Sequence, residues 1–135
     1  MKCISIKNPW LELLLRGQKT IEIRNWKPRF ELPQRVLLHA GKKVDSEAEI
    51  LFNIHTMNSN KGAILGSALL WSIKTYITKE SWIRDIKEHR NLPEWYLSGL
   101  SGLVFKDVQR FKIPIPWKGQ LNFFEVPDKI VEKII

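Results

Sequence analysis

The sequence predicts an α+β domain in which a small, mixed or mostly antiparallel β-barrel carries flanking helices. Segments with strand patterns outnumber segments with helical patterns, and the two alternate irregularly, unlike the regular strand–helix repeat of parallel α/β folds. The 135 residues are 44% hydrophobic and 27% charged, which is enough for an ordinary core without disulfides. Because no linker or repeat interrupts the chain, we expect residues 1–135 to form a single domain.

The first two predicted strands carry clear alternating patterns. Residues 2–7 place Ile4 and Ile6 on one face, which is typical of a half-buried strand. Residues 20–24 alternate strictly as well, so the two isoleucines of this segment share one face and its threonine, glutamate and arginine share the other. The polar face of this second strand is therefore a candidate for function.

The remaining strands are predicted from longer apolar segments. They cover residues 36–40, 63–76, 102–115 and 121–126. Gly66 lies inside the long apolar run and predicts a bulge or a close backbone approach. Pro114 and Pro116 favour an edge position or a bend, because proline cannot donate to a central ladder.

Three helices are predicted between the strands, near residues 9–16, 45–57 and 78–89. Each follows residues that favour a helix N-terminus, namely Asn8-Pro9, Asp45 or Ser46, and Thr78. The third helix is expected to place Trp82, Ile83 and Ile86 in the core. Asp128 is expected to cap a short terminal helix.

The formal net charge of +8 is concentrated in one part of the chain. Residues 1–45 contain ten Lys and Arg residues and four acidic residues. The remaining 90 residues contain twelve Lys and Arg residues and ten acidic residues. Many proteins are basic without a specific reason, but a clustered positive field favours a polyanionic partner such as RNA or a nucleotide.

Other classes of protein are disfavoured by what the sequence contains. No stretch reaches the roughly 18 uncharged apolar residues of a membrane span, and charges interrupt the N-terminus too early for a signal peptide, so we expect a cytoplasmic protein with no membrane contact. The single cysteine, Cys3, excludes an internal disulfide and a multi-cysteine zinc site. No phosphate-loop, dinucleotide or metal-ligand pattern occurs, and we expect no cofactor and no metal.

Three segments together resemble a known family. They are Gly17-Gln18-Lys19-Thr20-Ile21-Glu22-Ile23-Arg24, then His39-Ala40-Gly41-Lys42-Lys43, and Trp117-Lys118-Gly119 with the following Phe-Glu-Val. Their order and content resemble ASCH domains of the PUA-like superfamily, in which the first segment has the form Gly-x-Lys-x-x-x-x-Arg. The resemblance covers most of the chain and implies a barrel with a basic cleft, similar to modules that bind RNA or modified bases.

Some proteins of this family are bacterial amidohydrolases that remove acetyl from N4-acetylcytidine with a lysine, a threonine and a glutamate. Lys19 matches the lysine, but the threonine position is occupied by Glu22. The strand expected to supply the glutamate, residues 64–71, has no carboxylate. We therefore predict that this deacetylase activity is absent, because a hydroxyl nucleophile and its base are both missing.

The resemblance and the charge pattern give a set of candidate nucleic-acid-binding residues: Lys19, Arg24, Trp26, His39, Lys42, Lys43 and Trp117. The cationic members are expected to contact phosphates with little contribution to stability. The indoles are expected either to stack on an unpaired base or to fasten loops to the barrel. Ser5 is a further candidate on the polar face of the first strand, whereas Trp71 and Trp82 are expected in the core.

Three functions remain open from the sequence. The first is an RNA- or modified-nucleobase-binding module. The second is a small hydrolase of RNA or modified nucleosides, with Glu22 as general base and Lys19 at a lowered pKa. These same residues also fit an ordinary salt-bridged strand face. The third is a protein-interaction domain of the coactivator type, whose basic face meets an acidic partner.

Overall fold

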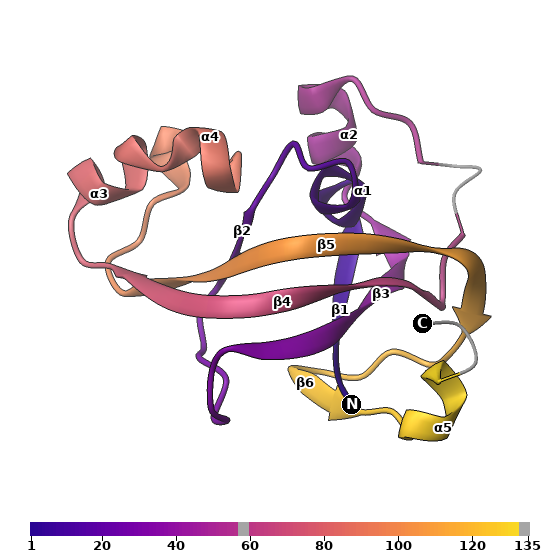
Figure 1. Cartoon of the computed structure of the whole chain (residues 1–135). Helices are drawn as coiled ribbons and strands as arrows, with labels where there is room; N and C mark the ends of the chain where they lie inside the picture. The colour runs from indigo at the N-terminus through magenta and orange to yellow at the C-terminus, as the bar shows by residue number, and fades with distance from the viewer. Residues whose placement is uncertain (57–59, 133–135) are drawn as a thin grey trace.

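The computed structural model describes residues 1–56 and 60–132, and its six strands form one sheet with the order β2-β5-β4-β3-β1-β6 (Figure 1). The strands are β1 (Lys2–Asn8), β2 (Ile21–Arg24), β3 (Gln34–Val44), β4 (Ala63–Tyr76), β5 (Leu100–Pro116) and β6 (Phe123–Glu125). β1 runs parallel to β3, whereas the other pairings are antiparallel. The predicted mixed α+β fold is therefore confirmed.

The prediction of a closed barrel is wrong, because the sheet is open. β2 and β6 are its two edges, and in the described residues β2 pairs along one side only, with β5. In the described residues, no ladder of main-chain hydrogen bonds joins β2 to β1. A side chain of β2 makes the connection instead. The Arg24 guanidinium donates from Nη2 to the main-chain oxygen of Ser5 at 3.1 Å.

In the described residues, five α-helices accompany the sheet: α1 (Trp10–Leu15), α2 (Ser46–Phe52), α3 (Lys79–Arg84), α4 (Ile86–His89) and α5 (Asp128–Val131). α1 packs against β1, β3 and β5. Figure 1 shows α1 and α2 on one side of the sheet, α3 and α4 beyond the end of β4, and α5 beside β6. The predicted end of the second helix near Met57 lies outside the described residues; within them, α2 ends at Phe52. No described helix has the length and apolar character needed to cross a membrane.

Two of the predicted helix caps are confirmed. The side chains of Asp45 and Thr78 each accept a hydrogen bond from the amide three residues further on, at 3.1 and 3.2 Å. Asn8 accepts from an amide of α1 as well, although that helix begins two residues later than Asn8. The cap expected of Asp128 is wrong: its carboxylate instead binds the Met1 amine at 2.8 Å.

The predicted third helix is divided into α3 and α4 at Asp85. The Asp85 carboxylate accepts from the Tyr76 hydroxyl at 2.7 Å and the Lys74 ammonium at 2.9 Å. These contacts fasten the residue to the end of β4, and its backbone leaves the helical conformation. Trp82 is buried as predicted, but Ile83 is 47% exposed, so that part of the predicted core is wrong.

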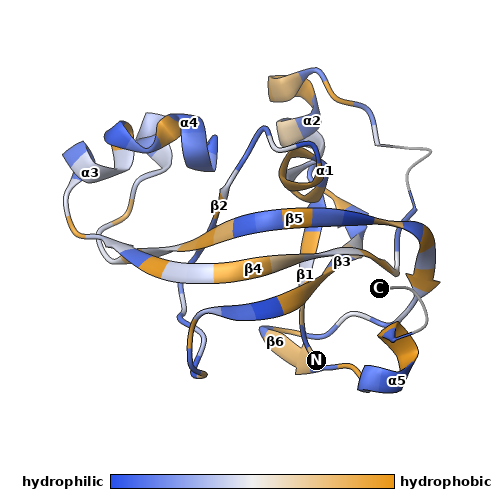
Figure 2. Cartoon of the chain, viewed as in Figure 1, coloured by the Kyte–Doolittle hydropathy of each residue, from blue (hydrophilic) through white to orange (hydrophobic). Residues whose placement is uncertain are grey.

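Two clusters of the described residues make up much of the core, one between α1 and the sheet, which includes Ile4, and one that contains Cys3 and Phe124. β1 is therefore covered on both faces, and burial raises the pKa of the Cys3 thiol to about 12. The core position predicted for Trp71 is wrong, since its side chain is 45% exposed beneath the Lys106 ammonium, 4.1 Å from the ring centroid. Figure 2 shows the hydrophilic middle of β5, the strand that supplies this lysine.

The expectation for Gly66 is confirmed. The pairing of β4 with β5 shifts register beside it, and a Cβ at this position would lie 2.3 Å from the main-chain oxygen of Gln109. Only glycine lets the two backbones approach this closely.

Candidate functional site

A cavity of about 760 Å³ lies where β2 approaches β1, at the open side of the sheet. Its lining comes mainly from four segments: Glu22, Arg24 and Trp26; Ser5 and Lys7; residues 41–43; and residues 118–122. The first three are strands or their ends, so the sheet fixes their positions. The last segment lies in the connection between β5 and β6.

The floor of this cavity contains a carboxylate held between two cations. Glu22 is 7% exposed, and its Oε2 atom accepts a hydrogen bond from Nε of Arg24 at 3.1 Å and forms an ion pair with Nη2 at 2.9 Å. Its Oε1 atom lies 3.3 Å from Nζ of Lys19. The network therefore fixes the Arg24 guanidinium at the cavity wall and leaves Glu22 with its charge compensated.

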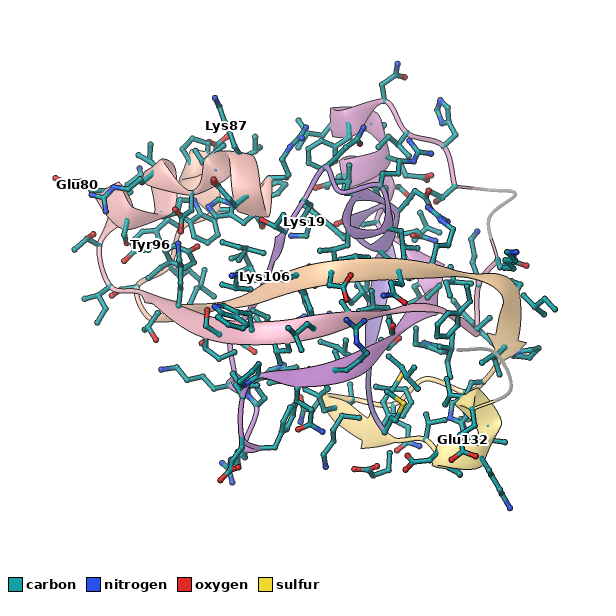
Figure 3. The ribbon with its side chains drawn as sticks, viewed as in Figure 1. Lys19, Glu80, Lys87, Tyr96, Lys106 and Glu132 are labelled. Atoms are coloured by element: carbon teal, nitrogen blue, oxygen red, sulfur yellow. The ribbon has the colours of Figure 1, made fainter. Side chains whose placement is uncertain are left out.

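Lys19 does not line the cavity, contrary to the direct ligand contact expected from the motif. Its side chain lies between α1 and α4, whereas Lys87 of α4 projects outward (Figure 3). The ammonium donates to the main-chain oxygens of Ile21 at 2.5 Å and His89 at 2.9 Å, and lies 5.0 Å from the Trp10 ring centroid. Burial lowers the pKa of Lys19, and the neighbouring Glu22 opposes that shift. Lys19 is thus a buried support for the site.

His39 links the first strand to the 117–122 segment. Its Nε2 atom lies 2.7 Å from the main-chain oxygen of Trp117, and its Nδ1 atom lies 2.9 Å from Oγ of Ser5. Since a carbonyl oxygen only accepts, Nε2 carries the proton, and Nδ1 of the neutral ring accepts from the serine hydroxyl. Both His39 and Ser5 line the cavity, so this chain of contacts positions one of its walls.

The tryptophans in or beside the three family-like segments have different positions. Trp26 and Trp10 line the cavity, and Arg24 lies 5.9 Å from the Trp26 ring centroid. Trp117 does not line it, because its ring packs against the cluster around Cys3. Of the two candidate stacking residues, only Trp26 is placed at this cavity.

The cavity lining contains four lysines, Lys7, Lys42, Lys43 and Lys118, in addition to Arg24 and the paired Glu22. Lys42 and Lys43 were predicted site residues. Lys7 and Lys118 were missed as site residues, although each lies within a segment whose sequence is informative: the first strand and the Trp-Lys-Gly motif. The lysine side chains are exposed, which leaves their charges accessible to an anion.

Acidification is expected to destabilise the protein through its two buried histidines. Burial lowers the pKa of both His39 and His89 from the usual 6.5. His89 has both nitrogens engaged, to the oxygen of Trp82 at 2.8 Å and the amide of Asn91 at 3.0 Å. The unfolded chain therefore binds more protons than the folded chain below about pH 6.5, and the free energy of unfolding falls as the pH falls through that value.

Urea unfolding at several pH values between about 7.5 and 5.5 measures this loss, above the range in which carboxylates titrate. A double variant, His39→Gln with His89→Gln, is expected to have a smaller dependence on pH. A free energy of unfolding that stays constant or rises as the pH is lowered across this range would contradict the prediction.

Comparison with known families identifies the chain. The model of the ASCH domain matches residues 4–114, which is more than half of the sequence. The chain therefore belongs to the ASCH domain family, as its three motifs predicted. A search of curated protein sequences gave no match.

Solved structures agree with this assignment. A crystal structure of an ASCH protein from Zymomonas mobilis has a TM-score of 0.72 at 17% identity, with 98% of this chain and 91% of that chain covered. A serine-to-alanine variant and a tyrosine-to-phenylalanine variant of the same protein have TM-scores of 0.71 and 0.72, also at 17% identity. Each covers 98% of this chain, with 92% and 94% of the respective variant chains covered. At this identity the likeness shows the fold.

Among the described residues, no group of three or more His, Cys, Asp or Glu side chains is arranged to hold a metal ion. The ionisable side chains at the cavity are mostly cationic, and its one lining carboxylate is already paired with Arg24 and Lys19. The chemistry of the lining therefore suits an anionic ligand.

Proposed function

We propose that this protein is an RNA- or nucleotide-binding module that holds phosphate and one base in the cavity between β1 and β2. The observation that carries the proposal is the grouping of five cationic side chains around Trp26 in one hollow. Phosphates supply the complementary charge, and an indole offers a stacking surface for an unpaired base. The volume of about 760 Å³ lies within the range of small-ligand sites, roughly 300 to 1,000 Å³.

Within this proposal, the groups at the cavity have separate tasks. Arg24 is oriented by Glu22 and by the main-chain oxygen of Ser5, so its remaining donors meet a phosphate at a fixed place. Lys42 and Lys43 belong to β3 and Lys118 to the 117–122 segment, so two separate segments supply positive charge to the cavity. A base beside Trp26 completes the contacts.

The hydrolase alternative gains less support from the geometry. A general base must be free to take a proton, whereas the Glu22 carboxylate is bound by Arg24 and Lys19 on its two oxygens. Lys19 has the lowered pKa that the alternative requires, but its ammonium is buried behind Glu22 and does not line the cavity. Binding without turnover is the function that this arrangement favours.

The protein-interaction alternative makes a different prediction about competition. An acidic protein partner would occupy the same lysines but would not need the indole of Trp26. Displacement of labelled RNA by a nucleoside monophosphate, and loss of that displacement in Trp26→Ala, therefore separate the two functions. An acidic peptide that competes while a nucleotide does not would favour the protein partner.

Removing lysine charges from the cavity is expected to weaken RNA binding at every sequence tested. We expect Lys42→Ala, Lys43→Ala and Lys118→Ala each to lower affinity by about threefold to tenfold. Each is also expected to reduce the slope of log K against log salt by roughly one unit, if the lysine it removes neutralises one phosphate. Fluorescence anisotropy with labelled single-stranded RNA at several salt concentrations measures both quantities.

Lys87→Ala is the matched control, because it removes one exposed lysine charge from α4, outside the residues that line the cavity. Its affinity and salt slope are expected to stay near those of the unmodified protein. Equal losses of RNA affinity in Lys87→Ala and Lys42→Ala would mean that the net charge of the protein, and not the cavity, determines binding.

A further inference from the structure

A second cavity adjoins the first, and most of its lining residues have no part in the binding proposed there. Its volume is about 760 Å³, and it lies beside the loop between β2 and β3 and the start of β6. Two residues, Trp26 and Asn122, line both cavities. The two hollows are therefore neighbours that share an indole and an amide side chain.

The wall of this second cavity is aromatic. Phe123 makes edge-to-face contacts with Phe30 and Trp26, with ring centroids 5.0 and 5.8 Å apart. All three rings are partly buried against the main core, so their positions are set by packing. Fixed aromatic rings of this kind provide a surface on which bases of a single strand stack, whatever their identity.

The charge of the second cavity is positive. Lys27 and Arg29 line it with exposed side chains, and neither takes part in an ion pair within the described residues. Lys2 adds a third cation, 5.6 Å from the Phe30 ring centroid and paired with Glu125 outside the lining. No carboxylate is among the described residues that line this hollow.

We propose that the second cavity receives the nucleotide adjacent to the one held in the first, so that the protein binds single-stranded nucleic acid across two contiguous subsites. This inference rests on the proposed function and deepens it. The shared Trp26 lies between the two subsites, and Lys27 and Arg29 contact the phosphates of the flanking nucleotide. A duplex is excluded as the ligand, because its paired bases are not free to enter two neighbouring pockets.

The length of the ligand distinguishes one subsite from two. We compare a nucleoside monophosphate with the corresponding tetranucleotide at about 0.15 M salt, where charges more than roughly 8 Å apart are largely screened. The unmodified protein is expected to bind the tetranucleotide at least tenfold more tightly than the monophosphate. Equal affinities would overturn the second subsite, and equal affinity for a duplex of the same sequence would overturn the single-strand requirement.

A double variant, Lys27→Ala with Arg29→Ala, tests which residues provide the second subsite. It is expected to lower tetranucleotide affinity about tenfold while leaving monophosphate affinity within twofold. Phe30→Leu, which keeps an apolar side chain but removes the ring, is expected to act in the same direction, with folding checked by circular dichroism. The matched control is Lys79→Ala with Lys87→Ala, which removes two exposed charges from α3 and α4.

The outcomes separate this inference from the function on which it rests. If Lys27→Ala with Arg29→Ala weakens both ligands equally, or if the control pair weakens the tetranucleotide as much, the second subsite is overturned while the first stands. If the unmodified protein binds neither the monophosphate nor the tetranucleotide, the proposed function itself fails. If Lys42→Ala with Lys43→Ala weakens both ligands and Lys27→Ala with Arg29→Ala weakens only the longer one, both proposals are supported.

Discussion

Lys19→Met is expected to lower the free energy of unfolding by about 3 kcal/mol, because it removes one partner of a buried charge network. The Lys19 side chain is 1% exposed, and its ammonium supplies hydrogen bonds to two main-chain oxygens. Methionine fills a similar volume but donates nothing, so the Ile21 oxygen loses this buried donor, the His89 oxygen keeps its bond from the Asn91 side-chain amide, and Glu22 keeps only Arg24. Urea unfolding with linear extrapolation measures the loss.

Lys42→Met makes the same chemical change on an exposed side chain of β3. It is expected to alter the free energy of unfolding by less than about 0.5 kcal/mol, as surface substitutions usually do. Equal effects of Lys19→Met and Lys42→Met would contradict the structural role given to Lys19. Such a result would indicate that Lys19 is a surface residue that contacts the ligand, as its motif alone suggested.

The second large effect is expected from Gly119→Ala, which adds one methyl group behind the 117–122 segment. A Cβ at this position would lie 2.8 Å from Cε1 of His39 and 3.1 Å from Oγ of Ser5. His39 is held by hydrogen bonds at both nitrogens and cannot move aside cheaply, so the segment has to shift outward. Because residues 118–122 line the first cavity, we expect RNA affinity to fall at least tenfold.

Anisotropy titrations measure the affinity, and thermal unfolding checks that Gly119→Ala is still folded. Gly41→Ala is the control on the same cavity, since its Cβ would lie at an ordinary 3.4 Å from Oγ of Ser5. We expect Gly41→Ala to bind RNA within about threefold of the unmodified protein. A folded Gly119→Ala variant with unchanged affinity would show that the position of this segment does not matter for binding.

Much of the fold was predictable because the sequence patterns that indicate its strands and helices are local. Alternation placed β1 and β2, apolar runs placed β3, β4 and β5, and the side chains of Asp45 and Thr78 marked two helix starts. Gly66 was recognisable as a point of close approach for the same reason. The sequence signals for these features are local, so a single sequence contains them, even though the backbone that Gly66 approaches is that of the distant Gln109.

The features that were missed depend on contacts between distant residues. Asp85 breaks a helical pattern because β4 supplies two donors to its carboxylate, and the sequence of the helix does not show this. Lysine is a residue type that usually lies at the surface, but Lys19 is buried between α1 and α4. Whether the sheet closes into a barrel likewise depends on the curvature of the whole sheet and on the lengths of its strands.

The candidate site was predicted in part. Arg24, Trp26, His39 and residues 42–43 lie at one cavity, as their positions in or beside two of the three motifs suggested. Residues 120–122 were not among the predicted site residues, and they reach the cavity because β6 pairs with β1 and brings the preceding segment with it. A contribution of this kind requires the sheet order, which the sequence alone did not supply.

The contact from Arg24 to the main-chain oxygen of Ser5 spans the open side of the sheet, beside the first cavity. In a barrel closed by a ladder, widening the wall would break several main-chain hydrogen bonds together. Here, in the described residues, no ladder joins β2 to β1, and the contact from Arg24 to Ser5 links the two strands. In the proposed function, an anionic ligand therefore reaches the remaining donors of Arg24 without breaking a strand pairing.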